Sequence, residues 1–284
     1  MRVTRTGQAF LAGAALAVAG FAVSPAPAQS SDTSTQREAP PSFAEFKAST
    51  FKDTDGQYIV NGDEPIASSK ELRQYYDRMV GAYENSDGGG KGDGSTSLVV
   101  NQDGGGDDVW SGSQVRNLTY CVSTAFGSDY GVVVNAMQQG AALWEGASSA
   151  VDFVYVPSAD SNCTTSNNSV LFSVEPTFTT QYIARAFFPS SGDFERNVLV
   201  NSSSLQTSGW PPSNILGHEL GHSLGFRHEH TRPEAGTCFE DNNWRPLTPY
   251  DSASIMHYPQ CNGTSSDLSF SSNDGAGTRA VYGS

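Results

Sequence analysis

The chain has 284 residues, which is long enough for one large domain with an appendage or for two small domains. Its formal net charge of −14 argues against a nucleic-acid partner, because contacts to phosphates need clustered lysine and arginine. This acidity favours solubility instead. Outside the N-terminus no apolar run approaches the roughly 20 residues of a membrane-crossing helix, so we expect no membrane span.

Residues 1–28 have the composition of a secretory signal peptide. Arg2 and Arg5 precede the apolar stretch AFLAGAALAVAGFAV, and the small residues of Ala26-Pro27-Ala28 provide a cleavage site. The apolar stretch is too short for a membrane anchor, and no cysteine precedes Cys121 to carry a lipid. We therefore predict export to the extracellular space or the periplasm, with cleavage after Ala28.

Residues 29–108 are expected to form a pro-segment and a linker. Residues 29–42 are rich in serine, threonine, proline and glutamine and favour disorder. FKDTDGQYIVNGDEPI then predicts a turn and a short strand, and SSKELRQYYDRMVGAY predicts a helix capped by Ser68 or Ser69. The apolar face of that helix is formed by four side chains: Leu72, Tyr75, Tyr76 and Met79.

Two acidic stretches of this segment have alternative interpretations. Asp53-Thr54-Asp55-Gly56 has two carboxylates of a calcium loop, but the remaining ligands are missing, so we expect a turn. Residues 85–108 are rich in glycine and aspartate around one apolar island and predict a linker. A second domain is therefore expected over residues 109–284.

The second domain mixes helix and strand patterns. LTYCV, residues 118–122, alternates as a strand does, and further strands are predicted over 151–156, 170–175, 184–189 and 197–201. An apolar stripe at helical spacing lies between the first two: Tyr130, Val133, Val134, Met137, Ala141 and Trp144. This mixture predicts an α+β fold in which helices back a sheet.

Four cysteines in an exported chain predict two disulfides, for which three pairings are possible. Cys121 and Cys163 lie in the strand–helix–strand block, whereas Cys238 and Cys261 lie in a later one. Pairing within each block closes short loops, so we predict Cys121–Cys163 and Cys238–Cys261. No CxxC pair occurs, which argues against a thiolate zinc site.

Four of the five histidines lie in HELGHSLGFRHEH, residues 218–230. Ser213 follows two prolines and is expected to cap a helix that runs through ILGHELGHSLG. His218 and His222 are four residues apart and project from one face of that helix, a spacing that suits two nitrogens on one zinc ion. Glu219 is rotated by about 100° from His218 and can reach a water molecule at the metal without being a ligand.

Gly225 and His228 complete this pattern. A glycine three residues after His222 permits φ > 0, so the chain can turn back and bring His228 to the same metal. A bare HExxH is common, but HExxHxxGxxH is expected by chance in about one chain of this length in 100,000. We therefore predict one zinc ion bound by His218, His222 and His228.

The motif resembles that of the metzincin zinc endopeptidases, and the full string HELGHSLGFRHEH is most similar to their astacin-type branch. SIMHY, residues 254–258, resembles the Met-turn of the same group, and YDSASIMHYPQC is similar to bacterial astacin-like secreted peptidases. The resemblance covers residues 109–284 and is dense from 214 to 261. It implies a metzincin-like catalytic domain in which a mixed twisted sheet is backed by helices and zinc lies in a cleft between two subdomains.

The resemblance also implies roles for single residues. Met256 is expected to form an apolar floor beneath the zinc ligands and Tyr258 to supply a fifth, displaceable ligand; ordinary core packing is the alternative for both. Glu229 is expected to fix the mature N-terminus or, alternatively, to be a plain surface charge. His230 and His257 are expected to be solvated or hydrogen-bonded and not to bind zinc.

Three histidines leave zinc an open position for water, which is typical of a catalytic site. Glu219 is expected to accept a proton from that water as it attacks a peptide carbonyl and to pass it to the leaving amine, with Tyr258 helping to stabilise the oxyanion. ARAFFPSSG, residues 184–192, is the expected edge strand for a protein or peptide substrate.

Two other functions stay open at this point. One is a secreted binding module whose zinc is structural, with Tyr258 as a permanent fourth ligand; Glu219 argues against it, because a closed site needs no carboxylate beside the metal. The other is a zinc hydrolase that acts on a non-peptide bond, such as an amide of the cell wall. The sequence does not give the oligomeric state, and we expect a monomer.

The resemblance finally implies a latent precursor, in which an aspartate of a short Gly-Asp motif in the pro-segment occupies the zinc. Asn61-Gly62-Asp63 follows the apolar strand YIV and matches this motif, although the aromatic residue usual before it is missing. A simple Asn-Gly turn is the alternative for Asp63. Asp55, by contrast, is expected to have no part in latency.

Overall fold

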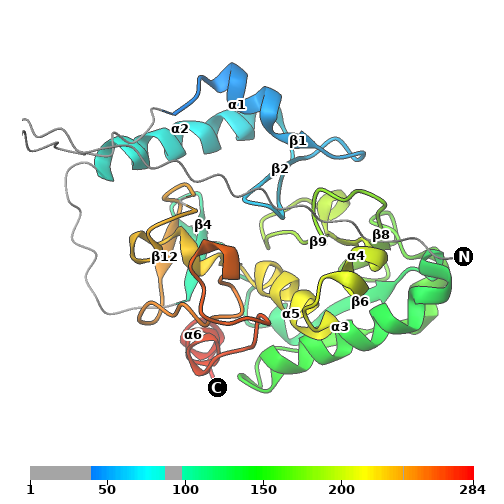
Figure 1. Cartoon of the computed structure of the whole chain (residues 1–284). Helices are drawn as coiled ribbons and strands as arrows, with labels where there is room; N and C mark the ends of the chain where they lie inside the picture. Colours follow the sequence, from blue (N-terminus) through cyan, green and yellow to red (C-terminus); the bar gives the residue numbers. More distant parts are fainter. Residues whose placement is uncertain (1–39, 87–97, 239) are drawn as a thin grey trace, which may run out of the picture. The chain divides into compact units, whose positions relative to one another are not determined.

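The computed structural model describes residues 40–86, 98–238 and 240–284, and residues 40–284 group into one compact unit (Figure 1). The predicted signal peptide lies outside the described residues, as do residues 29–39 and 87–97 of the predicted pro-segment and linker. None of the helices in the described ranges has the length and apolarity of a membrane-crossing helix.

Residues 40–86 form two helices and a three-stranded antiparallel sheet, β1-β2-β3. In chain order the elements are α1 (Phe43–Ser49), β1 (Phe51–Lys52), β2 (Tyr58–Val60), β3 (Glu64–Ile66) and α2 (Ser69–Ser86). Ser68 caps α2, because its hydroxyl accepts a hydrogen bond from the amide of Glu71. Leu72 and Tyr75 are buried against β2, so the predicted strand and the predicted helical stripe are both confirmed.

The main sheet has five strands in the order β7-β6-β8-β10-β9. Their bounds are β6 (Leu118–Val122), β7 (Phe153–Tyr155), β8 (Phe172–Pro176), β9 (Ala184–Arg185) and β10 (Asn197–Val200). Neighbouring strands are parallel except for β9, which pairs antiparallel with β10 at the edge. The sheet is therefore mixed, and the predicted α+β class is confirmed.

The helices of this part are α3 (Tyr130–Glu145), α4 (Ser202–Thr207), α5 (Pro212–Ser223) and α6 (Ser272–Tyr282). Helices α3 and α5 pack against each other (Figure 1). Glycines lie at their contact. A Cβ atom on Gly140 would lie 2.7 Å from the amide nitrogen of Gly217. The indole of Trp144 donates a hydrogen bond to the Gly217 carbonyl at 2.8 Å. The core helix α3 therefore fixes α5, which carries the first two histidines.

A second sheet lies around β4 (Val99–Asp103), which pairs with β11 (Phe226–Arg227), β12 (Trp244–Pro246) and β5 (Gly106–Asp107). The linker predicted over residues 85–108 is therefore wrong for β4 and β5. Val99 and Val100 are fully buried, because strands from far along the chain pair with both of their edges. The few apolar residues of β4 do not indicate in their own sequence that β11 and β12 will pair with them.

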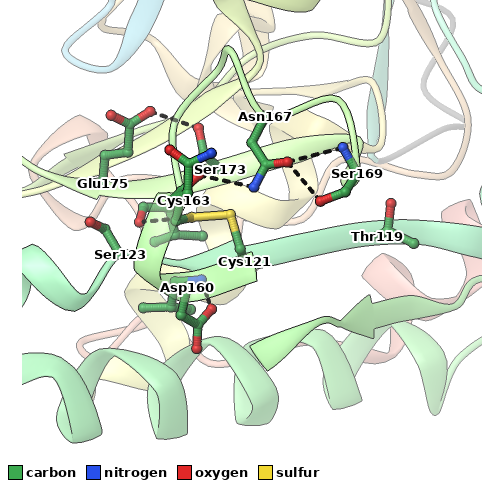
Figure 2. The surroundings of a disulfide bond; sticks show 12 residues. Thr119, Cys121, Ser123, Asp160, Cys163, Asn167, Ser169, Ser173 and Glu175 are labelled. Atoms are coloured by element: carbon green, nitrogen blue, oxygen red, sulfur yellow. Dashed lines mark hydrogen bonds between the residues drawn. A yellow bond between two sulfur atoms is a disulfide. The ribbon is translucent and has the colours of Figure 1, made fainter. Parts of the chain in front are cut away.

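Both predicted disulfides, Cys121–Cys163 and Cys238–Cys261, are present, each with a Cα–Cα distance of 5.6 Å. Figure 2 shows Cys163 bonded to Cys121 of β6. The carboxylate of Asp160 accepts a hydrogen bond from the amide of Val122 at 2.8 Å. The segment before Cys163 is thus fastened to β6 at two neighbouring residues.

Candidate metal centre

Helix α5 places three residues of the histidine motif in the interior. His218, Glu219 and His222 are each at most 2% exposed. The helix begins at Pro212, and Ser213 does not cap it as predicted. A proline at the first helical position already has the φ that a helix requires, and it has no amide hydrogen to be capped.

Two glycines let the surrounding chain approach the helix. Gly225 follows α5 with a φ of +95°, and a Cβ atom there would lie 2.1 Å from the carbonyl oxygen of Asp108. The predicted reversal at Gly225 is confirmed, and β11 then leads the chain to His228. A Cβ atom on Gly221 would lie 2.4 Å from the sulfur of Met256, so Met256 packs directly against α5.

Each of the three predicted zinc ligands has its Nδ1 atom held by an acceptor. Nδ1 of His218 is hydrogen-bonded to the carbonyl oxygen of Ile255 at 2.7 Å. Nδ1 of His222 is hydrogen-bonded to the carbonyl oxygen of Phe226 at 2.8 Å. The carboxylate of Glu240 bonds the third ring at 2.7 Å. These acceptors assign the ring hydrogen to Nδ1 and leave the Nε2 lone pair of each histidine free for a metal.

The Nε2 atoms have the spacing of ligands that share one metal ion. Those of His218 and His228 are 3.2 Å apart. Two nitrogens bound tetrahedrally to zinc at about 2.0–2.1 Å would lie roughly 3.3–3.4 Å apart. The Nε2 atom of His222 is buried and has no hydrogen-bond partner among the described residues. A zinc ion would satisfy it, so the residues present fit this metal.

Asp63 of the pro-segment completes the group of donors. One of its oxygens lies 3.2 Å from Nε2 of His228 and 3.5 Å from Nε2 of His222, and the other lies 3.2 Å from Nε2 of His218. All four donors lie within 4.8 Å of one another and all four residues are buried. Asp63 therefore belongs to the same group of possible metal donors as the three histidines.

The turn before Asp63 is what brings it to the histidines. Asn61 and Gly62 have φ values of 57° and 102°, so the predicted Asn-Gly turn is present as well. Burial opposes ionisation of Asp63, but the neighbouring His228 and His222 outweigh burial and hold its pKa well below the usual range. A carboxylate binds a metal in its ionised form.

Glu219 lies beside the four donors with an unused oxygen. Its Oε2 atom is buried and has no hydrogen-bond partner in the described part of the chain. Burial raises the pKa of Glu219 well above its usual range, and the charge of Asp63 raises it further. A carboxylate in this environment can both take up and release a proton.

Tyr258 is hydrogen-bonded to Asp63 in this state. Its hydroxyl donates to the Asp63 carboxylate, and its ring stacks on the ring of His218 with centroids 5.2 Å apart and planes at 13°. Burial raises the pKa of Tyr258 well above its usual range, and Asp63 raises it further. The phenol is therefore protonated and lies at the edge of the donor group.

The remaining motif residues are all hydrogen-bonded. Glu229 is fully buried, so the alternative that it is a plain surface charge is wrong. One of its carboxylate oxygens accepts a hydrogen bond from the amide of Asp251 at 3.0 Å. Its other oxygen has no hydrogen-bond partner among the described residues. His230 accepts from a backbone amide at 3.2 Å, and His257 shares a hydrogen bond with the Tyr250 hydroxyl at 2.8 Å.

Two carboxylates that support the zinc ligands are not predicted by the sequence pattern. Glu240 bonds the ring of His228, as described above. Asp274 accepts from the hydroxyl of Ser254 at 2.5 Å and from the amide of Ile255 at 2.9 Å, and so fixes the carbonyl that bonds His218. In the sequence both look like surface charges, because only the fold reveals the partners that justify their burial.

The turn at residues 53–56 has a further contact that the sequence did not predict. The amide of Gly56 donates to the carbonyl of Asp53 at 3.0 Å, so the expected turn is confirmed. Asp53 and Asp55 both pair with Arg185 of β9. The sequence analysis did not assign Asp55 this contact, and its expected lack of a part in latency stays a prediction.

Comparisons with known proteins return zinc metalloproteinases. Over 93 residues the chain is 34% identical to zinc metalloproteinase nas-30 of Caenorhabditis elegans, a match that covers 25% of this chain and 13% of that protein. Over 72 residues it is 38% identical to high choriolytic enzyme 2 of Oryzias latipes, covering 19% of this chain and 25% of that one. The matches thus span a quarter or less of these relatives.

Among solved structures, myroilysin matches with a TM-score of 0.44 and 19% identity, covering 65% of this chain and 98% of that one. No family model matches the chain. The sequence matches confirm the resemblance to astacin-like metzincins that the histidine motif and the Met-turn indicate.

Proposed function

We propose that the chain is an exported, zinc-dependent endopeptidase that is made as a latent precursor with a signal peptide over residues 1–28. The observation that carries this proposal is the convergence of three buried imidazole nitrogens beside Glu219, which has one carboxylate oxygen without a hydrogen-bond partner among the described residues. His218, His222 and His228 would hold one zinc ion per chain. The sequence matches to zinc metalloproteinases support this choice of metal.

In the proposed reaction a bound zinc ion supplies Lewis acidity, which activates water and polarises a peptide carbonyl. Glu219 accepts a proton from the attacking water and delivers it to the nitrogen of the leaving amine. Once Asp63 is withdrawn, the Tyr258 hydroxyl loses its present acceptor and can donate to the developing oxyanion. Met256 packs on Gly221 of α5 and would form the apolar floor beneath the three zinc ligands.

A cavity of about 200 Å³ next to Glu219 supports a protein or peptide substrate. Ala184 of β9 borders one part of it, and Trp210, Ile215 and Leu268 give it an apolar lining. Such a lining suits the side chain of a residue close to the scissile bond. The edge strand β9, within residues 184–192, remains our candidate for pairing with an extended substrate.

Latency would follow from Asp63, which fills the position that an attacking water needs. The proposed pro-segment must then end before β4, because β4 pairs with β11, the strand that leads to His228. We therefore place the start of the catalytic domain at residue 98 instead of 109.

The test is hydrolysis of casein by the processed protein, with and without a chelator, for wild type and Glu219→Gln. We expect chelation and the substitution each to abolish cleavage, and zinc to restore the chelated wild type. New amino termini in the products, read by mass spectrometry, identify peptide-bond hydrolysis. No cleavage by zinc-loaded wild type would favour a structural zinc in a binding module, and release of amino groups from cell-wall amides alone would favour the non-peptide hydrolase.

A further inference from the structure

Arg227 is a buried arginine that lies directly before the third predicted zinc ligand. It ends strand β11, and neighbouring residues of a strand point to opposite faces. Phe226 packs in the main core, whereas the guanidinium of Arg227 lies among carboxylates. The side chain of Arg227 is 3% exposed, and a cation at such a depth is costly unless it is paired.

Glu240 links this arginine to His228. One of its carboxylate oxygens accepts a hydrogen bond from Nδ1 of His228 at 2.7 Å, and the other accepts one from Nη2 of Arg227 at 2.9 Å. His230 approaches only the first oxygen, at 3.4 Å. Among the described residues, Arg227 is therefore the hydrogen-bond donor that fixes the second oxygen. Without this donor, the carboxylate would be free to turn away from the ring of His228.

Asp241 gives the guanidinium a second anchor. Nη1 of Arg227 donates to Asp241, so two nitrogens of one side chain hold two consecutive carboxylates. Residues 240 and 241 belong to neither a helix nor a strand, so their position depends on side-chain contacts. The hydroxyl of Thr231 adds one bond, to the Asp241 carbonyl at 3.3 Å. Together with the disulfide of Cys238, the guanidinium fixes this irregular segment beside the histidines.

The pro-segment contacts this arrangement without replacing any part of it. Glu64 lies 3.3 Å from Nη2 of Arg227, and Nε of Arg78 lies 2.6 Å from an oxygen of Asp241. Removal of the pro-segment would take away one anion and one cation, so the local net charge would not change. Arg227 would keep both of its carboxylate partners in the catalytic part, Glu240 and Asp241.

We propose that Arg227 is a positioning residue of the zinc site, which acts through Glu240 to orient His228 and to keep Nε2 of that ring directed at the metal. The inference rests on the proposed zinc-dependent function. A carboxylate that bonds the second nitrogen of a ligating histidine fixes the ring and raises its basicity. Arg227 lies one contact further out, so its loss should reach the metal only through Glu240.

The experiment measures the zinc affinity of the processed protein by competition with a chelator. Arg227→Gln should weaken zinc binding roughly 10- to 100-fold, the range for lost support of a metal ligand. Arg227→Lys should lose less, because an ammonium group keeps the charge but lacks the planar fork that bonds two carboxylates. Arg185→Gln is the matched control, because Arg185 is also buried but pairs with Asp53 and Asp55 of the pro-segment. The zinc affinity of this control should equal that of wild type.

A second comparison separates support of the ligand from general stability. Glu240→Gln alone removes the carboxylate through which Arg227 acts, so Arg227→Gln in that background should not weaken zinc binding further. If Arg227→Gln does not fold, Arg227→Lys takes its place in both backgrounds. Wild-type zinc affinity of the single variant, an equal loss in Arg185→Gln, or an equal loss in both backgrounds would overturn the proposal. A processed wild-type protein that binds no zinc would instead overturn the proposed function.

Discussion

Replacement of Asp63 by alanine should release the latency of the precursor while the pro-segment stays bound. Asp63 lies 3.2–3.5 Å from three imidazole nitrogens and accepts a hydrogen bond from Tyr258. Loss of one partner from a buried charged pair costs about 3–5 kcal/mol, so the balance between open and blocked sites should shift by roughly 10²- to 10⁴-fold. Asp53, Asp55 and Glu64 still hold the pro-segment through buried arginines.

The assay compares peptide hydrolysis by unprocessed Asp63→Ala and wild-type precursors, with chain integrity checked by mass spectrometry. Asp77→Ala is the matched control, because this aspartate is exposed on α2 and pairs with Arg73 one turn away. Asp55→Ala cannot serve as a neutral control, since Asp55 binds Arg185. If intact Asp63→Ala precursor is as inactive as Asp77→Ala, the blocking role of Asp63 is refuted.

Three further predictions concern the base, the support of one ligand and the packing of α5. Glu219→Gln should keep zinc and fold but lose roughly 10²- to 10⁴-fold in kcat; a kcat within tenfold of wild type would mean that another group accepts the proton. Glu240→Gln should weaken zinc binding roughly 10- to 100-fold in a chelator competition, because the carboxylate that bonds His228 is lost; unchanged affinity would exclude this supporting role. Gly140→Ala should lower the free energy of unfolding by about 1–3 kcal/mol, since the new Cβ atom meets the amide of Gly217 at 2.7 Å; a denaturant midpoint equal to that of wild type would contradict the close packing of α3 on α5.

The histidines could be predicted from the sequence because local geometry decides their relative positions. His218 and His222 share one helical face, and the positive φ of Gly225 returns the chain within a few residues. The strands of the main sheet and the apolar stripe of α3 could be predicted in the same way, because alternation and helical spacing are patterns of neighbouring residues. Asp63 was an intermediate case: a short motif indicated it, and a turn was the alternative. In the structure the turn is present and carries Asp63 to the histidines.

What the sequence could not reveal depends on partners that are distant along the chain. Glu240 and Asp274 resemble surface charges until the histidine and the turn that they support are brought next to them. Arg185 lies in a pattern typical of a strand, and its charge acquires a role only when Asp53 and Asp55 pair with it. Strand β4 was taken for linker because glycine and aspartate surround two valines whose burial depends on strands formed much later.

Anomalous diffraction at the zinc edge, from crystals of the unprocessed precursor, tests the central claim most directly. The account predicts one strong peak per chain at about 2.0–2.1 Å from Nε2 of His218, His222 and His228 and within bonding distance of an Asp63 oxygen. A zinc peak elsewhere, or a peak at the three histidines with Asp63 turned away from it, would contradict the account.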